Sequence, residues 1–315
     1  MLNVFRRGGS ALEAQAVVPG WRPPEDAIWI DLLEPSREEE LAVETALGLE
    51  LPTVAEMMAL EPSSRLYQEG GATFMTASLL GHGDEPEPMS TPVTFALSKD
   101  VLITLRYTDL KAFNVYSARA REASGGAEAL LGLLDAVVER LARVLDGLGD
   151  RTGVASAMIF RRAGPKDFQA LLTGLAQTQS ATALARTSLV SLSRLLSFAA
   201  LAPEIGTGEG RRAHLASLQQ DTQSLTEHAS YLSSHTAFLL DAALGLINIE
   251  QNGIIKFFSV VAVVFMPPTL IASIYGMNFD YMPELHWRAG YPLAVLLMLT
   301  AAVLPVVWFK RRGWF

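Results

Sequence analysis

The sequence predicts a membrane protein of α+β/α construction, with an N-terminal α/β domain, a long helical stalk and two C-terminal transmembrane helices. Of the 315 residues 50% are hydrophobic and 18% are charged, and the mean hydropathy is +0.26, so the chain is more apolar than an average soluble domain. Two charge-free segments near the C-terminus hold much of this apolar excess. Strand-like segments occur only in residues 1–112, whereas helical patterns fill the rest of the chain.

Residues 1–112 form the predicted α/β domain. Short runs rich in β-branched and aromatic residues, bounded by turn residues, predict strands at 27–33, 72–80, 92–98 and 101–107, the last two joined as a hairpin. Proline followed by acidic residues predicts helices at 35–47 and 52–60. Because Glu38, Glu39 and Glu40 stand on the first turn of a helix, we interpret them as a solvated, dipole-favoured face rather than as a catalytic cluster.

Composition narrows the classes of function. The chain has no cysteine, which excludes disulfides and thiolate metal sites. Its formal charge of −8 argues against a nucleic-acid partner, since phosphate binding needs clustered Lys and Arg. The N-terminus carries no apolar leader, so we expect the large leading part to stay in the cytoplasm. No nucleophile, base and orienting group can be placed together and no Gly-rich phosphate loop occurs, so we expect neither an enzyme nor a cofactor.

Residues 113–210 are predicted to form an antiparallel helical layer. Long helical patterns run through 130–160 and 167–201, and Ala163-Gly164-Pro165 separates them. A third helical pattern begins near Arg211 and continues to Tyr275, which makes about 65 residues, or on the order of 95 Å of helix if it is continuous. Its first part, residues 211–256, is the predicted stalk.

A leucine heptad runs along this stalk. Its leucines, and the small residues that follow the first four of them by four positions, are Leu218, Leu225, Leu232, Leu239 and Leu246 with Thr222, Ala229, Thr236 and Ala243. Such a stripe requires partner helices, and its length favours parallel self-association of the stalk.

Two polar rows lie beside the heptad, each with the same seven-residue interval. The first row is His214, Asp221, His228 and His235. Residues seven apart on one helix are separated by about 10.5 Å, so only rings formed between subunits could chelate a metal, and a polar helix interface is the alternative. The second row is Glu227, Ser234, Asp241 and Asn248. Asp241 is an acid among apolar neighbours close to the membrane, and it is either a cation-binding interface residue or a solvated one.

The two apolar segments, 257–275 and 291–309, are each 19 residues long and contain no charged residue. A helix of this length reaches roughly 28 Å, close to the hydrocarbon thickness of a bilayer. Lys256 precedes the first span, and residues 310–315 form a basic tail that begins Lys-Arg-Arg. By the positive-inside tendency both termini are cytoplasmic and the loop 276–290, with Asp280 and Glu284, is external. Tyr291, Trp308 and Trp314 suit interfacial positions.

A polar stripe follows the first span. A 3.5-residue spacing selects Asn252, Ile255, Ser259, Ala262, Met266, Thr269, Ser273 and Gly276, of which five are polar or glycine. Tight packing of small residues is one explanation. The other is an oligomer whose first spans surround a water-filled path, which the second spans shield from lipid. Pro267 and Pro268 should bend the helix and free carbonyl oxygens in mid-span.

The external turn carries the most specific motif. Tyr275-Gly276-Met277-Asn278 closes the first span, and Met282-Pro283-Glu284-Leu285 follows. Together with Asn252-Gly-Ile-Ile-Lys256 and Phe265-Met-Pro at the required places in a two-span tail, this pattern resembles the CorA family of magnesium channels. The chain departs from the commoner Met-Pro-Leu-Thr of that family by having Met266-Pro267-Pro268-Thr269.

The resemblance implies a homopentamer in a prokaryotic-type inner membrane, whose five first spans line one pore for hydrated Mg²⁺. Gly276 and Asn278 would form an external selectivity ring of oxygen ligands, and Asp280 and Glu284 would attract cations. Co²⁺ and Ni²⁺ would be further cargo. The positions matched inside the pore are Asn252, Ile255, Met266 and Thr269, and Asp241 matches a stalk acid that binds regulatory divalent cation. A zinc transporter of the ZntB type is the alternative within this architecture, and a non-conducting membrane-anchored coiled-coil scaffold is the alternative from another class.

Overall fold

The computed structural model describes residues 1–8, 13–14, 20–58, 65–81, 88–161, 167–278, 280 and 282–313. They form two compact units, Met1–Asp241 and Ala242–Phe315. The mixed α/β fold followed by long helices, with two apolar helices at the C-terminus, agrees with the predicted fold class. The bounds of the seven segments predicted from the sequence, from the α/β domain (1–112) to the basic tail (310–315), stay predictions.

The N-terminal unit is built on a mixed sheet whose described strands lie in the order β2-β1-β3-β7-β6-β5-β4. Their bounds are Leu2–Arg6 for β1, Glu13–Ala14 for β2, Ala27–Leu33 for β3, Leu66–Glu69 for β4, Ala72–Gly81 for β5, Met89–Ser98 for β6 and Val101–Arg106 for β7. Only β3 and β7 pair in parallel among these strands, with Ile30 opposite Ile103.

All of the predicted strands are present, and β1, β2 and β4 are additional. The predicted hairpin is formed by β6 and β7, with Ser98 opposite Val101. Lys99 in its turn has a φ of 55°, a left-handed conformation that two-residue hairpin turns require. The sheet therefore carries two more strands at one edge and one more at the other than the sequence predicts.

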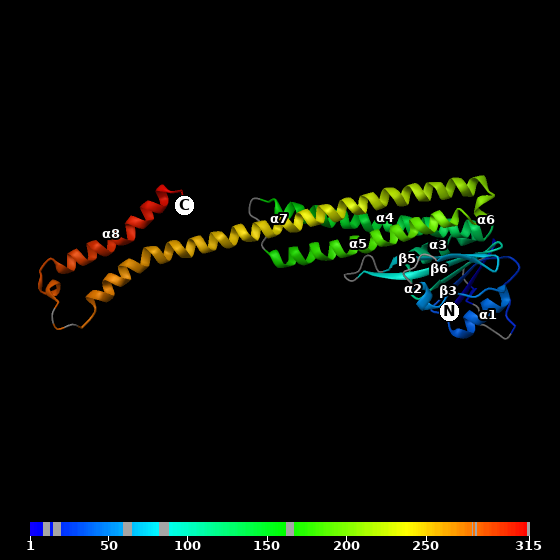
Figure 1. Cartoon of the computed structure of the whole chain (residues 1–315), viewed down its shortest axis with the longest axis horizontal. Helices are drawn as coiled ribbons and strands as arrows, with labels where there is room; N and C mark the ends of the chain where they lie inside the picture. Colours follow the sequence, from blue (N-terminus) through cyan, green and yellow to red (C-terminus); the bar gives the residue numbers. More distant parts are fainter. Residues whose placement is uncertain are drawn as a thin grey trace. The chain divides into compact units, whose positions relative to one another are not determined.

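Alternate residues of the strands face two different cores. Met75, Phe95 and Leu102 pack with the helices that follow the sheet, whereas their neighbours Phe74, Ala96 and Ile103 pack on the other face. That second face is covered by α1 (Arg37–Leu47) and α2 (Val54–Met58), which contribute Val43 and Met57 (Figure 1). The period-two alternation of a strand thus places one hydrophobic core on each side of the sheet.

The start of α1 corrects one prediction. The helix begins at Arg37 and not at Pro35, because Ser36 caps it: the Glu39 amide donates to the Ser36 hydroxyl, and the Ser36 amide donates to the Glu39 carboxylate. Glu39 also accepts a hydrogen bond of 2.9 Å from the N-terminal amine of Met1. This carboxylate is therefore part of a capping box. Residues 59–60, the end of the second predicted helix, lie outside the described residues.

A buried ion pair joins the parallel strands. Arg106 Nη2 donates to Asp31 Oδ2 at 2.9 Å and Nε donates to Oδ1 at 3.0 Å, and the two side chains are only 4% and 3% exposed. Thr104 donates to the same carboxylate, and the Arg106 guanidinium lies 4.5 Å from the centre of the Phe113 ring. Every charge in this network is paired, which is the condition under which burial of a charge is tolerated.

Long helices cover the first face of the sheet. Their bounds, with the short helices between them, are Lys111–Ser117 for α3, Ala120–Glu122 for η2, Gly126–Ile159 for α4, Phe168–Ala199 for α5, Pro203–Gly206 for α6 and Glu209–Tyr275 for α7. Helix α4 starts in close contact with the β6–β7 turn, since the Gly126 amide donates to the Asp100 carbonyl at 2.6 Å. A Cβ on Gly126 would lie 2.6 Å from the Leu102 backbone nitrogen, so only glycine fits here. The predicted break at 163–165 lies outside the described residues.

The leucine heptad of α7 packs inside the chain, and the prediction that it mediates self-association is wrong. Leu218, Ala229 and Leu232 belong to the same core as residues of α4 and α5, and Leu239 and Ala243 are fully buried. Two side-chain hydrogen bonds tie the helices together: Gln179 of α5 donates to Ser233, and Gln219 donates to the Leu196 carbonyl. A heptad shows that a helix needs partners, and here α4 and α5 are the partners.

Candidate ion pathway

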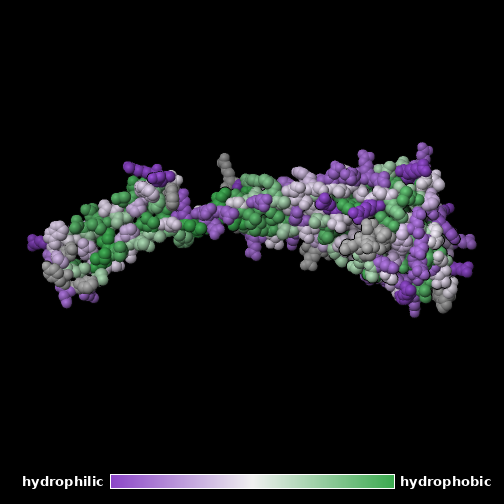
Figure 2. Space-filling model, viewed as in Figure 1, coloured by the Kyte–Doolittle hydropathy of each residue, from purple (hydrophilic) through white to green (hydrophobic). Residues whose placement is uncertain are grey.

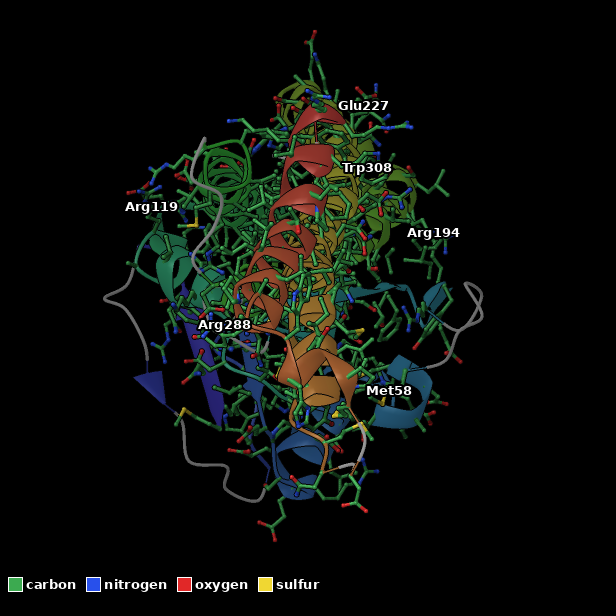
Figure 3. The ribbon with its side chains drawn as sticks, turned by 90° about the vertical axis from the view of Figure 1, so that its left-hand side faces the viewer. Met58, Arg119, Arg194, Glu227, Arg288 and Trp308 are labelled. Carbon is green, nitrogen blue, oxygen red and sulfur yellow. The ribbon has the colours of Figure 1, made fainter. Side chains whose placement is uncertain are left out.

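The C-terminal unit consists of the last part of α7, a short η3 helix (Pro283–His286) and α8 (Gly290–Arg311). Helices α7 and α8 are long and apolar enough to cross a membrane. Figure 2 shows hydrophobic side chains gathered on the surface of this unit. Helix α8 ends in Lys310 and Arg311, and the Arg312 guanidinium lies 5.4 Å from the centre of the Trp308 ring. Figure 3 labels Arg288, two residues before α8, and Trp308 in its last turn.

The predicted polar stripe occupies one exposed face of α7. Its members within the helix are all exposed to the surface of the single chain, and they are Asn252, Ile255, Ser259, Ala262, Met266, Thr269 and Ser273. Met266 is 69% exposed and Ile255 is 54% exposed. Four of them, Ala262, Met266, Thr269 and Ser273, line a shallow groove of about 490 Å³.

The opposite face of the same span is covered. The residues of reduced exposure in the span are Val260, Val261, Val264, Pro267, Pro268, Ile271 and Tyr275. With a rotation of about 100° per residue, the mean direction of this set is roughly opposite to that of the polar stripe. The span therefore has one partly covered side and one exposed side, and the exposed side carries the polar stripe together with large apolar residues such as Phe265 and Leu270.

The residues of helix α8 suit a helix that packs against another helix on one side and faces lipid on the other. Its less exposed positions are Gly290, Ala294, Val295, Met298, Ala301, Ala302, Pro305 and Phe309. Four of these eight residues are glycine or alanine, which are common at helix contacts in membranes, while leucines such as Leu296, Leu299 and Leu304 are exposed. This division separates a helix-packing face from a lipid-type face on the second span.

Two hydroxyl groups on the stripe have their hydrogens engaged by the backbone. Ser259 donates to the Ile255 carbonyl at 2.8 Å, and Thr269 donates to the Phe265 carbonyl at 2.7 Å. The oxygen lone pairs stay available, so each exposed hydroxyl acts as an acceptor. Helix α7 is continuous through Pro267 and Pro268, which have no N–H to give to the carbonyls of Val263 and Val264.

The external turn follows the end of α7 directly. The Gly276 amide donates to the Ala272 carbonyl at 3.0 Å, and a Cβ at Gly276 would lie 3.2 Å from that same oxygen. Asn278 and Asp280 are exposed, and the ring of His286 lies 3.4 Å from the Met282 carbonyl. Residues 279, 281 and 314–315 (with Trp314) and the side chain of Glu284 lie outside the described part of the chain, so the predicted role of Glu284 stays a prediction.

The predicted metal-binding residues of the stalk do not form a site within one chain. Asp241, His214 and His228 are exposed, and no group of three or more His, Asp or Glu residues able to hold a metal occurs among the described residues. A larger cavity of about 530 Å³ lies wholly in the N-terminal unit, lined in part by Tyr116, Glu128 and Arg211. The sequence did not indicate this cavity, because its walls come from three separate stretches of the chain, 115–123, 128–139 and 208–214.

The sequence also did not single out the aromatic residues of the stalk. Tyr231 and Phe238 are large, exposed and seven residues apart, and their rings stack with those of His228 and His235. Their spacing in the sequence was the signal that could have found them.

Comparisons with known proteins agree with this architecture. The model of the family "CorA-like Mg2+ transporter protein" matches residues 24–311. The magnesium transport protein CorA of Escherichia coli K12 is 36% identical over 318 aligned positions, covering 100% of both chains. The structure of the CorA magnesium transporter from Methanocaldococcus jannaschii superposes with a TM-score of 0.76 at 20% identity, covering 100% of this chain and 99% of that one. The ZntB cytoplasmic domain of Vibrio parahaemolyticus matches 70% of this chain and 87% of its own, with a TM-score of 0.52 at 11% identity.

The family match spans both units, including the two apolar helices and the Tyr-Gly-Met-Asn turn between them. The family is one of ion transporters rather than enzymes. On the full-length identity and the family match together, this chain belongs to the CorA-like Mg²⁺ transporter family.

Proposed function

We propose that this chain assembles as a homopentamer in the inner membrane and conducts hydrated Mg²⁺ into the cytoplasm, with Co²⁺ and Ni²⁺ as further cargo and with gating by intracellular divalent cation. The single observation that carries the proposal is the two-sided first span. A membrane anchor needs no polar face, whereas five spans around an axis need one polar and one covered face each.

The chemistry of the stripe suits a hydrated divalent cation. Mg²⁺ gives up its water reluctantly and prefers oxygen ligands. The water molecules around it present hydrogens outward, and the Ser259 and Thr269 oxygens are acceptors with their own hydrogens engaged elsewhere. Gly276 and Asn278, which follow directly on α7, supply backbone and amide oxygens for the external ring, and the Asp280 carboxylate raises the local cation concentration.

Apolar members of the stripe supply gates. Ile255 and Met266 are both exposed on the face that carries the polar residues. A constriction of such side chains blocks ions by excluding water. No ATP is needed for inward movement, because two charges moving down an inside-negative potential release about 4.6 kcal/mol per 100 mV.

Regulation is assigned to Asp241. The carboxylate is exposed at the end of the N-terminal unit, and the described residues of the same chain offer it no cluster of ligands. A divalent cation there takes its other ligands from a second subunit or from water, and it bridges like-charged faces in the closed state.

A zinc transporter of the ZntB type is the second candidate. The row His214, His228 and His235 favours it, since imidazole is a common zinc ligand. The intact Gly276-Met277-Asn278 turn favours magnesium. The third candidate, a non-conducting scaffold, has no use for the polar stripe.

Flux measurements separate the three candidates. The purified full-length chain in liposomes is tested for Mg²⁺ and Zn²⁺ entry, first with an inside-negative potential and then with a proton gradient. Potential-driven Mg²⁺ entry without a proton gradient is the expected result. Zinc entry stimulated by protons with little Mg²⁺ entry would make the protein a zinc transporter. If neither ion entered, the non-conducting scaffold would be the remaining candidate.

A further inference from the structure

Helix α8 carries a groove that the proposed ion pathway does not use. The groove measures about 370 Å³, and its lining residues are Thr300, Val303, Leu304, Val307, Trp308 and Arg311. These residues recur every three to four positions, so they share one face of the helix. That face is apolar in its middle and cationic at its end. We call it the α8 groove.

The α8 groove lies on the free side of the helix. Val303, Leu304, Val307 and Trp308 are all exposed, Leu304 to 68%. At about 100° per residue, the groove is roughly 140° around α8 from the centre of the less exposed positions that suit helix packing. An apolar side of a membrane-spanning helix that faces away from its packing side is in contact with the acyl chains of lipids.

The length of the α8 groove matches one leaflet of a bilayer. From Thr300 to Arg311 the helix rises by about 16 Å, and half of a hydrocarbon core is about 15 Å thick. The polar atom at the inner end is already satisfied, because the Thr300 hydroxyl donates to the Leu296 carbonyl at 2.6 Å. An acyl chain can therefore lie along the groove with its headgroup at Arg311.

Three consecutive cations, Lys310, Arg311 and Arg312, stand at the headgroup end, where Figure 2 shows hydrophilic residues beside the hydrophobic surface of α8. In the described part of the chain no carboxylate forms an ion pair with any of the three. The Arg312 guanidinium lies 5.4 Å from the centre of the Trp308 ring, a cation–π distance that holds this charge beside the groove. Guanidinium groups bind the oxygens of a phosphate in pairs, so this end suits a phosphate headgroup.

The other end of α8 lacks this preference for anions. The loop before the helix carries Arg288 together with two acids, Asp280 and Glu284. Only the end at residues 310–312 has an excess of positive charge, and such an excess next to a membrane attracts anionic lipids. The charge pattern therefore selects both the kind of lipid and the leaflet.

Other occupants fit the groove less well. A second copy of the chain packed along the α8 groove would bring two sets of three cations together, and like charges repel. A zwitterionic lipid would fill the apolar part, but its headgroup would add a positive charge beside Arg311 and Arg312. An anionic lipid satisfies both the apolar strip and the cations.

We propose that the α8 groove binds one anionic phospholipid, whose acyl chain lies along residues 300–307 and whose phosphate contacts Arg311 and Arg312. The proposal requires that α8 crosses a membrane, and it does not depend on which ion the chain conducts. The bound lipid fixes the depth of α8 in its leaflet, because the phosphate and the end of the apolar strip are tied to one molecule.

Trp308 reports the occupant of the groove directly. In a full-length Trp287→Phe/Trp314→Phe variant, Trp308 is the one tryptophan left in the C-terminal unit. The protein is placed in vesicles of phosphatidylcholine and phosphatidylglycerol in equal amounts, with one or the other lipid brominated in its acyl chains so that it quenches tryptophan on contact. We expect the quenching by phosphatidylglycerol to be several-fold stronger. Equal quenching by the two lipids, or quenching by neither, would overturn the proposal.

Two neighbouring cations separate a built site from diffuse attraction. Arg311→Gln and Lys310→Gln each remove one positive charge from the same end of α8, but only Arg311 lines the groove. In the Trp308 reporter protein, we expect Arg311→Gln to abolish most of the several-fold preference and Lys310→Gln to keep most of it. Equal losses in the two variants would show that anionic lipid gathers at this end without occupying the groove, and the proposal would be wrong.

A second pair of variants tests the apolar strip with every cation in place. Val303→Phe fills the groove, whereas Val306→Phe adds the same ring on another exposed side of α8. The phosphatidylglycerol that stays bound to the detergent-purified protein is counted by native mass spectrometry. We expect several-fold less retained lipid in Val303→Phe than in Val306→Phe. Equal retention, or displacement of the lipid by millimolar inorganic phosphate, would overturn the role of the acyl chain.

These measurements do not involve ion flux, so they are independent of the proposed function. A several-fold preference for phosphatidylglycerol in a protein that admits neither Mg²⁺ nor Zn²⁺ would support the lipid site and overturn the channel. Mg²⁺ entry without any lipid preference would overturn the lipid site alone.

Discussion

The two units of this chain differ in how far they bury leucine side chains. On one helix, Leu239 of the N-terminal unit is fully buried, whereas Leu244, five residues later in the C-terminal unit, is 49% exposed. The first leucine has its partners within the chain, and the second has none there. The N-terminal unit thus buries its apolar side chains within the chain, while the C-terminal unit leaves them on its surface, as expected of a unit that lies in a membrane.

The largest effect is expected from Asp31→Asn in the N-terminal unit. Loss of one partner leaves the Arg106 guanidinium buried without its counter-ion, which costs about 3–5 kcal/mol of unfolding free energy. Chemical unfolding of the full-length protein in detergent measures it. The control is Glu139→Gln, which breaks the exposed pair with Arg143 and should cost less than about 0.5 kcal/mol. Similar losses of unfolding free energy in the two variants would show that the buried pair contributes no more to stability than the exposed pair.

The leucine pair tests the comparison directly. We expect Leu239→Ala to lower the unfolding free energy by about 2–5 kcal/mol, because it leaves a cavity at a fully buried position. Leu244→Ala should change it by less than about 0.5 kcal/mol, as at other exposed positions. The same denaturation experiment serves for both, and a reversed order would mean that the stalk is buried on its other side.

Asn278→Ala should leave stability unchanged and reduce transport. The residue is exposed in the turn after α7, so its replacement removes no packing. In the proposed selectivity ring it would remove one oxygen ligand for each subunit. We expect Mg²⁺ entry into liposomes to fall at least about tenfold, which corresponds to roughly 1.4 kcal/mol in the barrier. Gln223→Ala, an exposed amide on the stalk, is the control for amide loss. Unchanged flux in the Asn278 variant would remove this residue from the selectivity ring.

The smallest effect concerns alkaline pH in the N-terminal unit. Burial, with the charges of Glu128 and Glu122, raises the pKa of Tyr116 from 10.0 to about 12. The folded state therefore favours the neutral phenol, so its contribution to stability is complete below pH 10 and is lost as the pH rises from 10 to about 12. Tyr116→Phe should flatten the fall of unfolding free energy over this interval, as measured by denaturation at several pH values. An equally steep fall would assign the pH dependence to other groups, such as Tyr107.

The sequence predicted the strands that consist of strong β-forming residues. The segments 27–33, 72–80, 92–98 and 101–107 are buried strands with strong β-formers, and each is found in place. Strand β4 was missed because Leu66–Glu69 is short and partly exposed. Strand β1, Leu2–Arg6, lacks flanking turn residues on its N-terminal side. Its burial comes from pairing with β3, a long-range contact that no local pattern shows.

The candidate site, like the fold, was predicted from the sequence only in part. The polar stripe was read from spacing alone, and its exposure on one face of α7 follows because helix geometry is periodic. The leucine heptad was assigned the wrong partner, since periodicity identifies a contact face without naming the helix that covers it. The stacked aromatic rings of the stalk needed the structure, because Phe160 joins them from a distant helix.

The hydroxyl hydrogens of Ser259 and Thr269 are bonded to backbone carbonyls. This affects whether these groups can contact anions or cations. Chloride and other anions are solvated by hydrogen-bond donors, and these two oxygens have no hydrogen left to offer. In the proposed pore, these two hydroxyl groups would disfavour anions without an ionised side chain at the bilayer centre, where such a charge would cost at least about 2.5 kcal/mol for each subunit. Discrimination by sign would then come from the orientation of hydroxyl dipoles, which the helix backbone fixes before any ion arrives.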